Sequence, residues 1–248
     1  MLKVRVIPIL TFNGFALVKT KQFSAPRMVG NPVQAAKVYN SRRVDELVFI
    51  DIMASRQNRK INSKIVKDVI KECYMPVTIG GGIDTIDDIN NLLKMGADKV
   101  LIKNKAISDP FFIKHSSEFF GAQCISIAVD VFRQNGDYLI FNHSEKILPL
   151  NEFINTVSDM GAGELIVNSV DLDGTMKGYD IDLYNEVSVL TNLPIVMAGG
   201  AGDVGHFTEL FTHTDCDSVA ASSIFHFTQF TPHDIKLELQ KIGKPVRF

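Results

Sequence analysis

The sequence MPVTIGGG at residues 75–82 returns as LPIVMAGG at residues 193–200, an offset of 118 positions. DELV at residues 45–48 returns as GELI at residues 163–166 with the same offset. Glycines close the first pair of segments, as expected for a buried strand that ends in a tight turn. Two segments that repeat in one register, half a chain apart, indicate two fused halves of related structure. Such a fold would carry two related ligand sites.

The rest of the chain has the same alternation of short apolar runs and helical patterns. The predicted strands are residues 4–10, 46–50, 77–79, 100–102, 124–129, 165–167, 195–197 and 218–220. Amphipathic helical spacing fills the intervals, for example in residues 60–73 and 84–95. Strands alternating with helices, over about 250 residues, predict a single (β/α)8 TIM barrel domain spanning residues 1–248. A doubly wound sheet is the competing architecture, and the half-barrel repeat argues against it.

Composition excludes several classes of protein. The 26 lysines and arginines nearly balance the 28 aspartates and glutamates, so no basic field recruits nucleic acid. No apolar stretch reaches the roughly 18 residues that a membrane span needs. The three cysteines, Cys73, Cys124 and Cys216, form no C-x-x-C pair, so we expect reduced thiols in a cytoplasmic protein. We expect neither a metal site nor a cofactor.

The glycine segments predict two phosphate sites. Glycine lets backbone amides approach an anion, and a helix that begins just after the loop favours negative charge. In (β/α)8 barrels a phosphate site is often built from the loops after strands seven and eight and a short extra helix. Residues 221–226 fit that extra helix, with Ser222 or Ser223 as its cap. Tight turns use glycine anyway, so the repeat and the serines carry this prediction.

Three aspartates lie at predicted carboxyl ends of strands, the rim that carries the chemistry in such barrels. They are Asp51, Asp130 and Asp173, and each is a candidate general acid or base. Loop capping is the alternative role, because aspartate is common in turns. Asp130 is the strongest candidate, since it ends an apolar strand with no N-G or D-G turn directly after it. Asp173 is followed by Gly174 and reads partly as a turn.

Charged residues begin four of the strands: Arg5, Glu46, Lys99 and Glu164. In a barrel they would meet around the axis at its floor. An ion-pair plug is one interpretation, although desolvation offsets much of the attraction in such a cluster. A polar gate is the other, because a plug could as easily be hydrophobic.

These motifs together resemble the cyclase subunit of imidazole glycerol phosphate synthase, one of the histidine-biosynthesis barrels. The resemblance runs from Arg5 to Phe227 and rests on residues 45–52, 78–83, 96–100, 169–180, 199–202 and 225–227. It implies a ligand with a phosphate at each end, and ammonia that a separate glutaminase subunit, a class I amidotransferase, delivers through the N-terminal face of the barrel. The implied products are imidazole glycerol phosphate and an aminoimidazole carboxamide ribotide.

The resemblance also implies roles for individual residues. The four charged residues at the floor match the family's gate at the ammonia entrance, and Asp98 would face the glutaminase. Asp130 would be catalytic, and Lys19 would lie near the substrate. The implied phosphate contacts are Gly82, Asn104, Asp173, Gly174, Gly200, Ser222 and Ser223.

One departure from the family concerns the catalytic pair. The family has a second catalytic aspartate at the end of strand one, where this chain has Thr11. The half-barrel repeat aligns Thr11 with Asp130, so the missing carboxylate is visible within the chain itself. Threonine has no useful pKa for either of the two proton transfers that ring closure needs. Lys103 also replaces a phosphate-binding asparagine, and Ala198 replaces a serine.

Two functions therefore remain open at this point. The first is a lyase-type cyclase that uses Asp130, with Lys19 or Asp51 compensating for Thr11. The second is a non-cyclising barrel that keeps the gate and the glutaminase interface. It would pass ammonia to a sugar amidotransferase in surface-polysaccharide biosynthesis.

Overall fold

Eight parallel strands close into a barrel in the computed structural model, which describes residues 3–142 and 148–248. The ring closes because the last barrel strand pairs with the first, with Arg5 opposite Ser218 and Pro8 opposite Ala221. The barrel strands are β1 (Arg5–Phe12), β4 (Leu47–Asp51), β5 (Val77–Gly80), β6 (Lys99–Ile102), β7 (Ile125–Gln134), β9 (Glu164–Ser169), β10 (Ile195–Ala198) and β11 (Ser218–Ala221). The predicted (β/α)8 barrel is confirmed.

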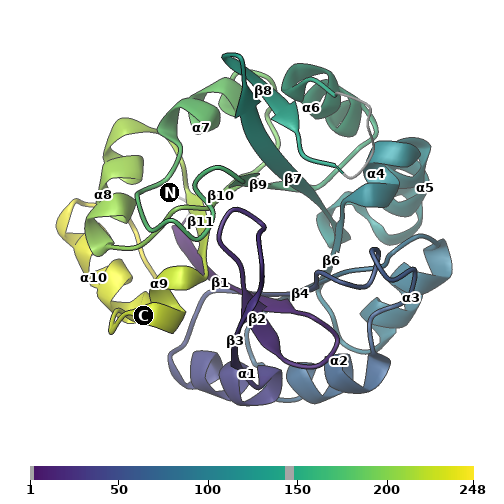
Figure 1. Cartoon of the computed structure of the whole chain (residues 1–248), viewed down its shortest axis with the longest axis horizontal. Coiled ribbons are helices and arrows are strands. Elements are labelled where there is room, and N and C mark those ends of the chain that lie inside the picture. Colours follow the sequence, from purple (N-terminus) through teal and green to yellow (C-terminus); the bar gives the residue numbers. More distant parts are fainter. Residues whose placement is uncertain (1–2, 143–147) are drawn as a thin grey trace.

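Helices follow the strands and form the outer layer around the barrel (Figure 1). They are α1 (Pro32–Ser41), α2 (Ser63–Ile70), α3 (Ile86–Lys94), α4 (Asn104–Ser108), α5 (Phe111–Phe120), α6 (Leu150–Asp159), α7 (Ile181–Ser188), α8 (Val204–His213), α9 (Ser223–Phe227) and α10 (Pro232–Lys241). Each crossover helix returns the chain from the carboxyl ends of the strands, the mouth of the barrel, to their amino ends, the floor. Among the described residues, no helix has the length and apolar character that a membrane crossing requires.

Strand alternation divides the core in two. Side chains that point outward, such as Val6 and Leu10, join a large cluster under the helices. Side chains that point inward, such as Ile7 and Ile9, fill the barrel itself. Because both faces of every barrel strand are covered, the strands read as continuous apolar runs in the sequence.

The two halves of the barrel correspond residue by residue. The offset is 118 positions for the pairs β4 with β9 and β5 with β10. It is 119 for β1 with β7, where the inward-facing residues Ile9 and Thr11 match Ala128 and Asp130. The short helices α4 and α9 occupy matching places after β6 and β11.

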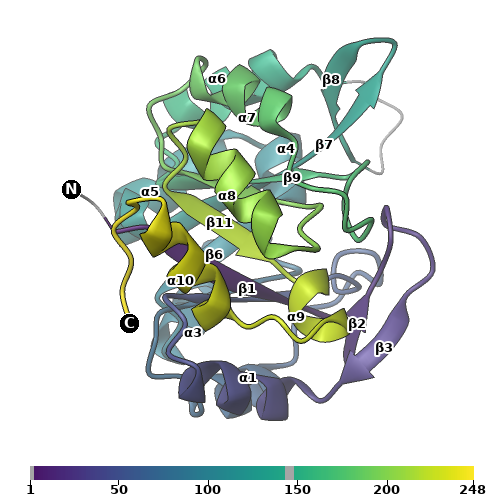
Figure 2. The ribbon, with the colours of Figure 1, turned by 90° about the vertical axis from the view of Figure 1, so that its left-hand side faces the viewer.

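Two hairpins extend the mouth of the barrel and were not predicted (Figure 2). Strands β2 (Leu17–Lys19) and β3 (Arg27–Gly30) form the first, which continues from β1. The second pairs β8 (Asp137–Ile140) with the end of β7. The prediction that Asp130 ends its strand is therefore wrong. Strand β7 runs four residues further and turns at Asn135-Gly136, where both residues have positive φ.

Candidate functional site

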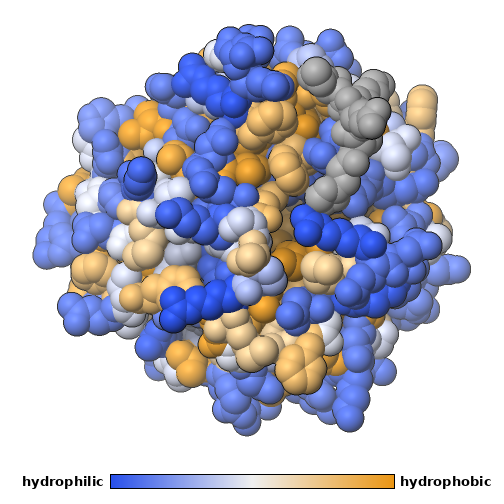
Figure 3. Space-filling model, viewed as in Figure 1, coloured by the Kyte–Doolittle hydropathy of each residue, from blue (hydrophilic) through white to orange (hydrophobic). Residues whose placement is uncertain are grey.

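One pocket at the mouth of the barrel collects every residue that the sequence assigned to catalysis or phosphate binding. Its wall contains Thr11, Lys19, Gly82, Asn104, Asp130, Asp173, Gly174, Gly200, Ser222 and Ser223. Figure 3 looks onto this face and shows apolar side chains at the centre, surrounded by strongly hydrophilic ones. The bottom of the pocket is apolar because Ile9, Leu101 and Ala128 point into the barrel there.

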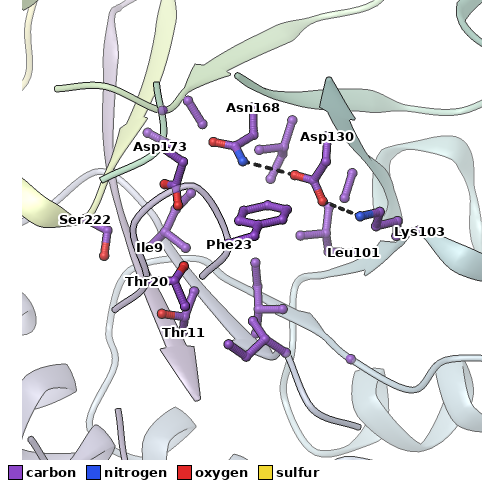
Figure 4. A pocket seen from close by; sticks show the side chains of 18 of the residues that line it. Ile9, Thr11, Thr20, Phe23, Leu101, Lys103, Asp130, Asn168, Asp173 and Ser222 are labelled. Atoms are coloured by element: carbon purple, nitrogen blue, oxygen red, sulfur yellow. Dashed lines mark hydrogen bonds and ion pairs between the residues drawn. The ribbon is translucent and has the colours of Figure 1, made fainter. Parts of the chain in front are cut away.

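Asp130 is held on one side of the pocket by two hydrogen bonds (Figure 4). The Lys103 ammonium donates to its Oδ2 at 2.6 Å, and the Asn168 amide donates to its Oδ1 at 3.1 Å. Asn168 follows Glu164 and Ile166 on the inward face of β9, at the period-2 spacing of a strand. That spacing was a signal for Asn168, which the sequence reasoning missed.

Thr11 occupies the position in β1 that matches Asp130 in β7. Its hydroxyl donates a hydrogen bond to the carbonyl of Val18 in the neighbouring strand β2. Hydroxyl and carboxylate thus lie at equivalent places in the two half-barrels and differ completely in their capacity to exchange a proton.

Lys19 and Asp173 form a second ion pair in the pocket wall. The Lys19 ammonium donates to both carboxylate oxygens of Asp173, at 2.6 and 2.9 Å, and both residues are buried. Burial raises the pKa of Asp173 above its ordinary value, although the attraction of Lys19 opposes this. The pair ties β2 to the loop after β9.

In each half of the barrel, a glycine loop contributes residues without side chains to the pocket wall. Gly82 has a φ of +67°, and a Cβ there would lie 2.4 Å from the carbonyl oxygen of Arg59. Gly200 has a φ of +99°, and a Cβ would lie 1.8 Å from the carbonyl oxygen of Gly178. Side chains are therefore excluded at both positions, and both glycines line the pocket with backbone atoms alone.

Two serine hydroxyls beside the second glycine loop lack a hydrogen-bond partner. Among residues 3–142 and 148–248, the buried side-chain oxygens or nitrogens without a hydrogen-bond partner are the Oγ atoms of Ser222 and Ser223. An unpaired buried hydroxyl costs about 1–3 kcal/mol, so two neighbouring ones in a pocket wall indicate a polar ligand. The predicted cap is not made, because neither hydroxyl bonds to the start of α9.

Asp51, the third candidate acid or base, is paired with Arg59. Its carboxylate is fully buried and accepts hydrogen bonds from both terminal nitrogens of the Arg59 guanidinium, 2.6 Å to Oδ2 and 3.0 Å to Oδ1. One oxygen also accepts from the Met53 amide at 3.1 Å. Asp51 therefore holds the loop after β4 in place, and its role in compensating for Thr11 stays a prediction.

The four charged residues at the strand beginnings meet as a closed ring at the floor. Arg5 contacts Glu46 at 2.8 Å and Glu164 at 2.6 Å, and Lys99 contacts both glutamates at 3.1 Å. Charges thus alternate in sign around the axis. The predicted juxtaposition is correct, and the ring closes the end of the barrel opposite the pocket.

The ring makes stability depend on pH. Burial disfavours ionised Glu164, but attraction to Arg5 and Lys99 outweighs it, so its pKa lies below the ordinary 4.5. Its stabilising contribution is then full above pH 4.5 and is lost as the pH falls through the lowered value. We expect Glu164→Gln to lower the free energy of unfolding by about 2 kcal/mol at neutral pH. Denaturant titrations should show this difference shrinking below pH 4.5. A difference that stays constant down to pH 3 would contradict the prediction.

Asp98 lies at the floor, as predicted, just before β6. Its side chain is exposed, and its Oδ2 accepts from the Val77 amide at 2.8 Å. It borders the ring through its neighbour Lys99.

Comparison with known proteins places the chain among enzymes of one pathway. A family profile described as histidine biosynthesis protein matches residues 5–231. The imidazole glycerol phosphate synthase subunit HisF of Streptococcus mutans serotype c is 38% identical over 251 residues, which cover both chains completely. The protein of the same name from Dehalococcoides mccartyi is 40% identical over 250 residues, covering all of this chain and 99% of the relative. That from Methanococcus maripaludis is 36% identical over 275 residues, covering both completely.

Proposed function

The chain belongs to the histidine biosynthesis protein family, in which it has the role of the cyclase subunit, and we propose that it joins ammonia from a partner glutaminase to a substrate with a phosphate at each end. The proposed product is imidazole glycerol phosphate, and the proposed class is a lyase coupled to a glutamine amidotransferase. The observation that carries the proposal is a single pocket that holds both glycine loops together with Asp130.

The two ends of the pocket suit two phosphates. At one end, Gly82 and Asn104 belong to the first half-barrel, and at the other, Gly200, Ser222 and Ser223 belong to the second. Backbone amides and the two unpartnered hydroxyls can donate to phosphate oxygens without adding net charge. We assign Gly174 and Asp173 to the second end because their loop borders the same wall.

The barrel axis supports delivery of ammonia from the floor. Above the charged ring, the axis is lined by apolar side chains: Ile7, Val48, Leu101, Ile166, Val196 and Ala220. An apolar stretch is much less costly for neutral ammonia than for ammonium, because burying an unpaired charge is expensive. Arg5, Glu46, Lys99 and Glu164 would then serve as the gate through which ammonia enters.

Exposed apolar side chains at the floor support a protein partner there. Tyr74 after α2, Phe119 near the end of α5 and Val189 after α7 are 91%, 72% and 82% exposed. All three lie where helices return to the amino ends of the strands, on the same face as Asp98. Exposed large apolar groups gathered on one face mark interaction surfaces. We therefore place the glutaminase on this face.

Replacing Tyr74 with Ser should weaken glutaminase binding by about tenfold or more, since buried aromatic anchors dominate interface energies. Phe15 is the matched control: it is 82% exposed but lies in the β1–β2 turn at the mouth. Phe15→Ser should leave the affinity unchanged in a titration followed by calorimetry. Equal effects of the two substitutions would place the partner elsewhere.

The proposed function is tested by mixing the purified chain, without any glutaminase, with an ammonium salt and the substrate. Formation of imidazole glycerol phosphate and the aminoimidazole carboxamide ribotide, followed by mass spectrometry, is the expected result. Unchanged substrate under conditions where a curated relative turns over would contradict the proposal.

The non-cyclising alternative in surface-polysaccharide biosynthesis rests on Thr11. The relatives compared above carry the synthase name, and none of them supports that pathway. We therefore retain the cyclase as the proposed function. Because Thr11 stands where the family has a carboxylate, another group must carry out one of the proton transfers of ring closure.

A further inference from the structure

Resting on the proposed cyclase, we propose that Lys103 is a catalytic residue that acts as the general acid beside Asp130 and supplies the proton transfer that Thr11 cannot. Lys103 follows β6 directly, and its ammonium lies in the pocket wall. Figure 4 shows it reaching Asp130 from the side opposite Asn168. Asp130 and Lys103 would then form an acid–base couple made of one carboxylate and one amine.

The position of the Lys103 side chain is fixed by its surroundings. Its Nζ lies 2.6 Å from Asp130 Oδ2 and faces the rings of Phe141 and Phe23, with 5.2 and 5.8 Å to their centroids. Cation–aromatic contacts hold the ammonium group at the pocket while the rings exclude water. A proton donor positioned in this way needs little rearrangement to reach a bound substrate.

Three other side chains of the pocket wall that were considered for proton transfer, Thr11, Lys19 and Asp51, are paired with other groups. The Thr11 hydroxyl donates to the Val18 carbonyl, Lys19 gives two hydrogen bonds to Asp173, and the Asp51 carboxylate is taken up by Arg59. Arginine side chains do not release a proton in proteins. Among the described residues that line the pocket, Lys103 is the amine in direct contact with Asp130.

The couple closes a proton cycle. When ammonia bonds to the substrate carbon, Asp130 accepts a proton from the new nitrogen. When the bond from that carbon to the departing ribotide amine breaks, the electron pair stays on the amine nitrogen, which takes a proton from Lys103. The neutral Lys103 amine then recovers a proton from the Asp130 carboxylic acid across their hydrogen bond. To close the ring, the same nitrogen also bonds to the substrate's carbonyl carbon, whose oxygen leaves as water. The hydrogens of ammonia and substrate are all found in the two products and this water, so Asp130 and Lys103 return to their starting states and no external acid or base is consumed.

Substitutions at position 103 separate proton donation from charge. Lys103→Gln removes both, whereas Lys103→Arg keeps a cation beside Asp130 but cannot donate a proton. Lys105→Gln is the matched control. Lys105 also pairs with an aspartate, Asp109 at 3.1 Å, and faces a phenylalanine ring, but it does not line the pocket.

Ammonium-dependent turnover should fall by a factor of about 10² or more in kcat for both Lys103→Gln and Lys103→Arg, with a small change in KM. Lys105→Gln should behave like the wild-type chain. The double variant Lys103→Asn, Thr11→Asp, which restores the family's pair of carboxylates, should regain turnover. Wild-type turnover in Lys103→Arg would show that only the charge matters and would overturn the inference, as would wild-type turnover in Lys103→Gln.

Chemical rescue guards against a merely structural effect. Alkylating Lys103→Cys with bromoethylamine rebuilds an amine at the same place that is less basic than lysine. Turnover should return, with the basic limb of its pH profile moved to lower pH, and the wild-type chain treated in the same way controls for Cys73, Cys124 and Cys216. Rescue with an unmoved basic limb, or no rescue in a folded protein, would overturn the inference. A wild-type chain without turnover would overturn the proposed function as well, whereas loss of the Lys103 effect alone leaves that function standing.

Discussion

Asp130→Asn is expected to lower ammonium-dependent kcat by a factor of about 10²–10⁴, the usual contribution of a positioned general acid–base group. Asparagine keeps the shape of the side chain, but its one carbonyl oxygen can accept from only one of the two donors, Lys103 and Asn168, that now contact different oxygens of Asp130. What disappears is the capacity to take a proton from the incoming nitrogen. Steady-state kinetics at saturating ammonium measures the effect, with substrate affinity determined separately.

The control for this substitution is Asp109→Asn. Asp109 also pairs with a lysine, Lys105, but it lies outside the pocket. The control variant should keep wild-type turnover, and thermal unfolding should show that both variants are folded. Turnover close to wild type in Asp130→Asn would remove Asp130 from the chemistry. It would also remove the basis for a proton exchange with Lys103.

Gly200→Ala is expected to destabilise the chain by about 3 kcal/mol or more, because strain at positive φ adds to a clash in a packed region. The φ of Gly200 is +99°, and its carbonyl accepts a hydrogen bond from the Gly178 amide at 2.9 Å. A methyl group would lie 1.8 Å from the Gly178 carbonyl oxygen, so the two loops must separate. Because these loops form the proposed second phosphate site, substrate affinity should fall together with stability.

Gly136→Ala is the control that separates the backbone strain at positive φ from the steric clash expected in Gly200→Ala. Gly136 has a similar φ of +97°, but no atom lies within 4 Å of the place where its Cβ would be. We expect a cost of about 1 kcal/mol there and no change in substrate affinity. Denaturant titrations of both variants measure the difference in unfolding free energy. Equal costs at the two glycines would mean that the close approach of the loops contributes nothing.

The barrel was predictable because its signals repeat and are local. Each strand is buried on both faces, so its apolar run stands out, and the recurrence of residues 75–82 at 193–200 fixes the relation of the two halves. The same logic placed the floor ring, since charged residues at equivalent strand beginnings must meet around the axis. The aspartates, the glycine loops and the two serines of the pocket followed from their position at strand ends, whereas Lys19, Asn104 and Gly174 were named only through the family resemblance.

The β7–β8 hairpin was missed although Asn135-Gly136 marks its turn, and Asn13-Gly14 marks the turn from β1 into β2 that leads to the other hairpin. Asn13-Gly14 and Asn135-Gly136 are the dipeptides that two-residue hairpin turns and similar turns favour. Strands β3 and β8 are short and only partly buried, so hydrophobic alternation is weak there. The sequence pattern therefore predicts that Asp130 ends its strand, and it does not associate Phe23 or Phe141 with the site.

The pairings among charged groups could not be read from the sequence. Asp51, Asp130 and Asp173 have the same sequence setting, a carboxylate near the end of a strand. Their partners differ: Arg59 comes from the loop after the same strand, Lys103 directly follows the neighbouring strand β6, and Lys19 comes from a hairpin 154 residues away. These partners set the surroundings of each carboxylate, and Asp130 is the one that we propose exchanges a proton.

The most direct test of the central claim follows the nitrogen of ammonia into the product. The chain alone, supplied with ¹⁵N-ammonium and the doubly phosphorylated substrate, should form imidazole glycerol phosphate that carries one ¹⁵N in its imidazole ring. The aminoimidazole carboxamide ribotide formed beside it should carry none. Substrate recovered unlabelled and unchanged, while a curated relative labels its product in the same buffer, would contradict the account.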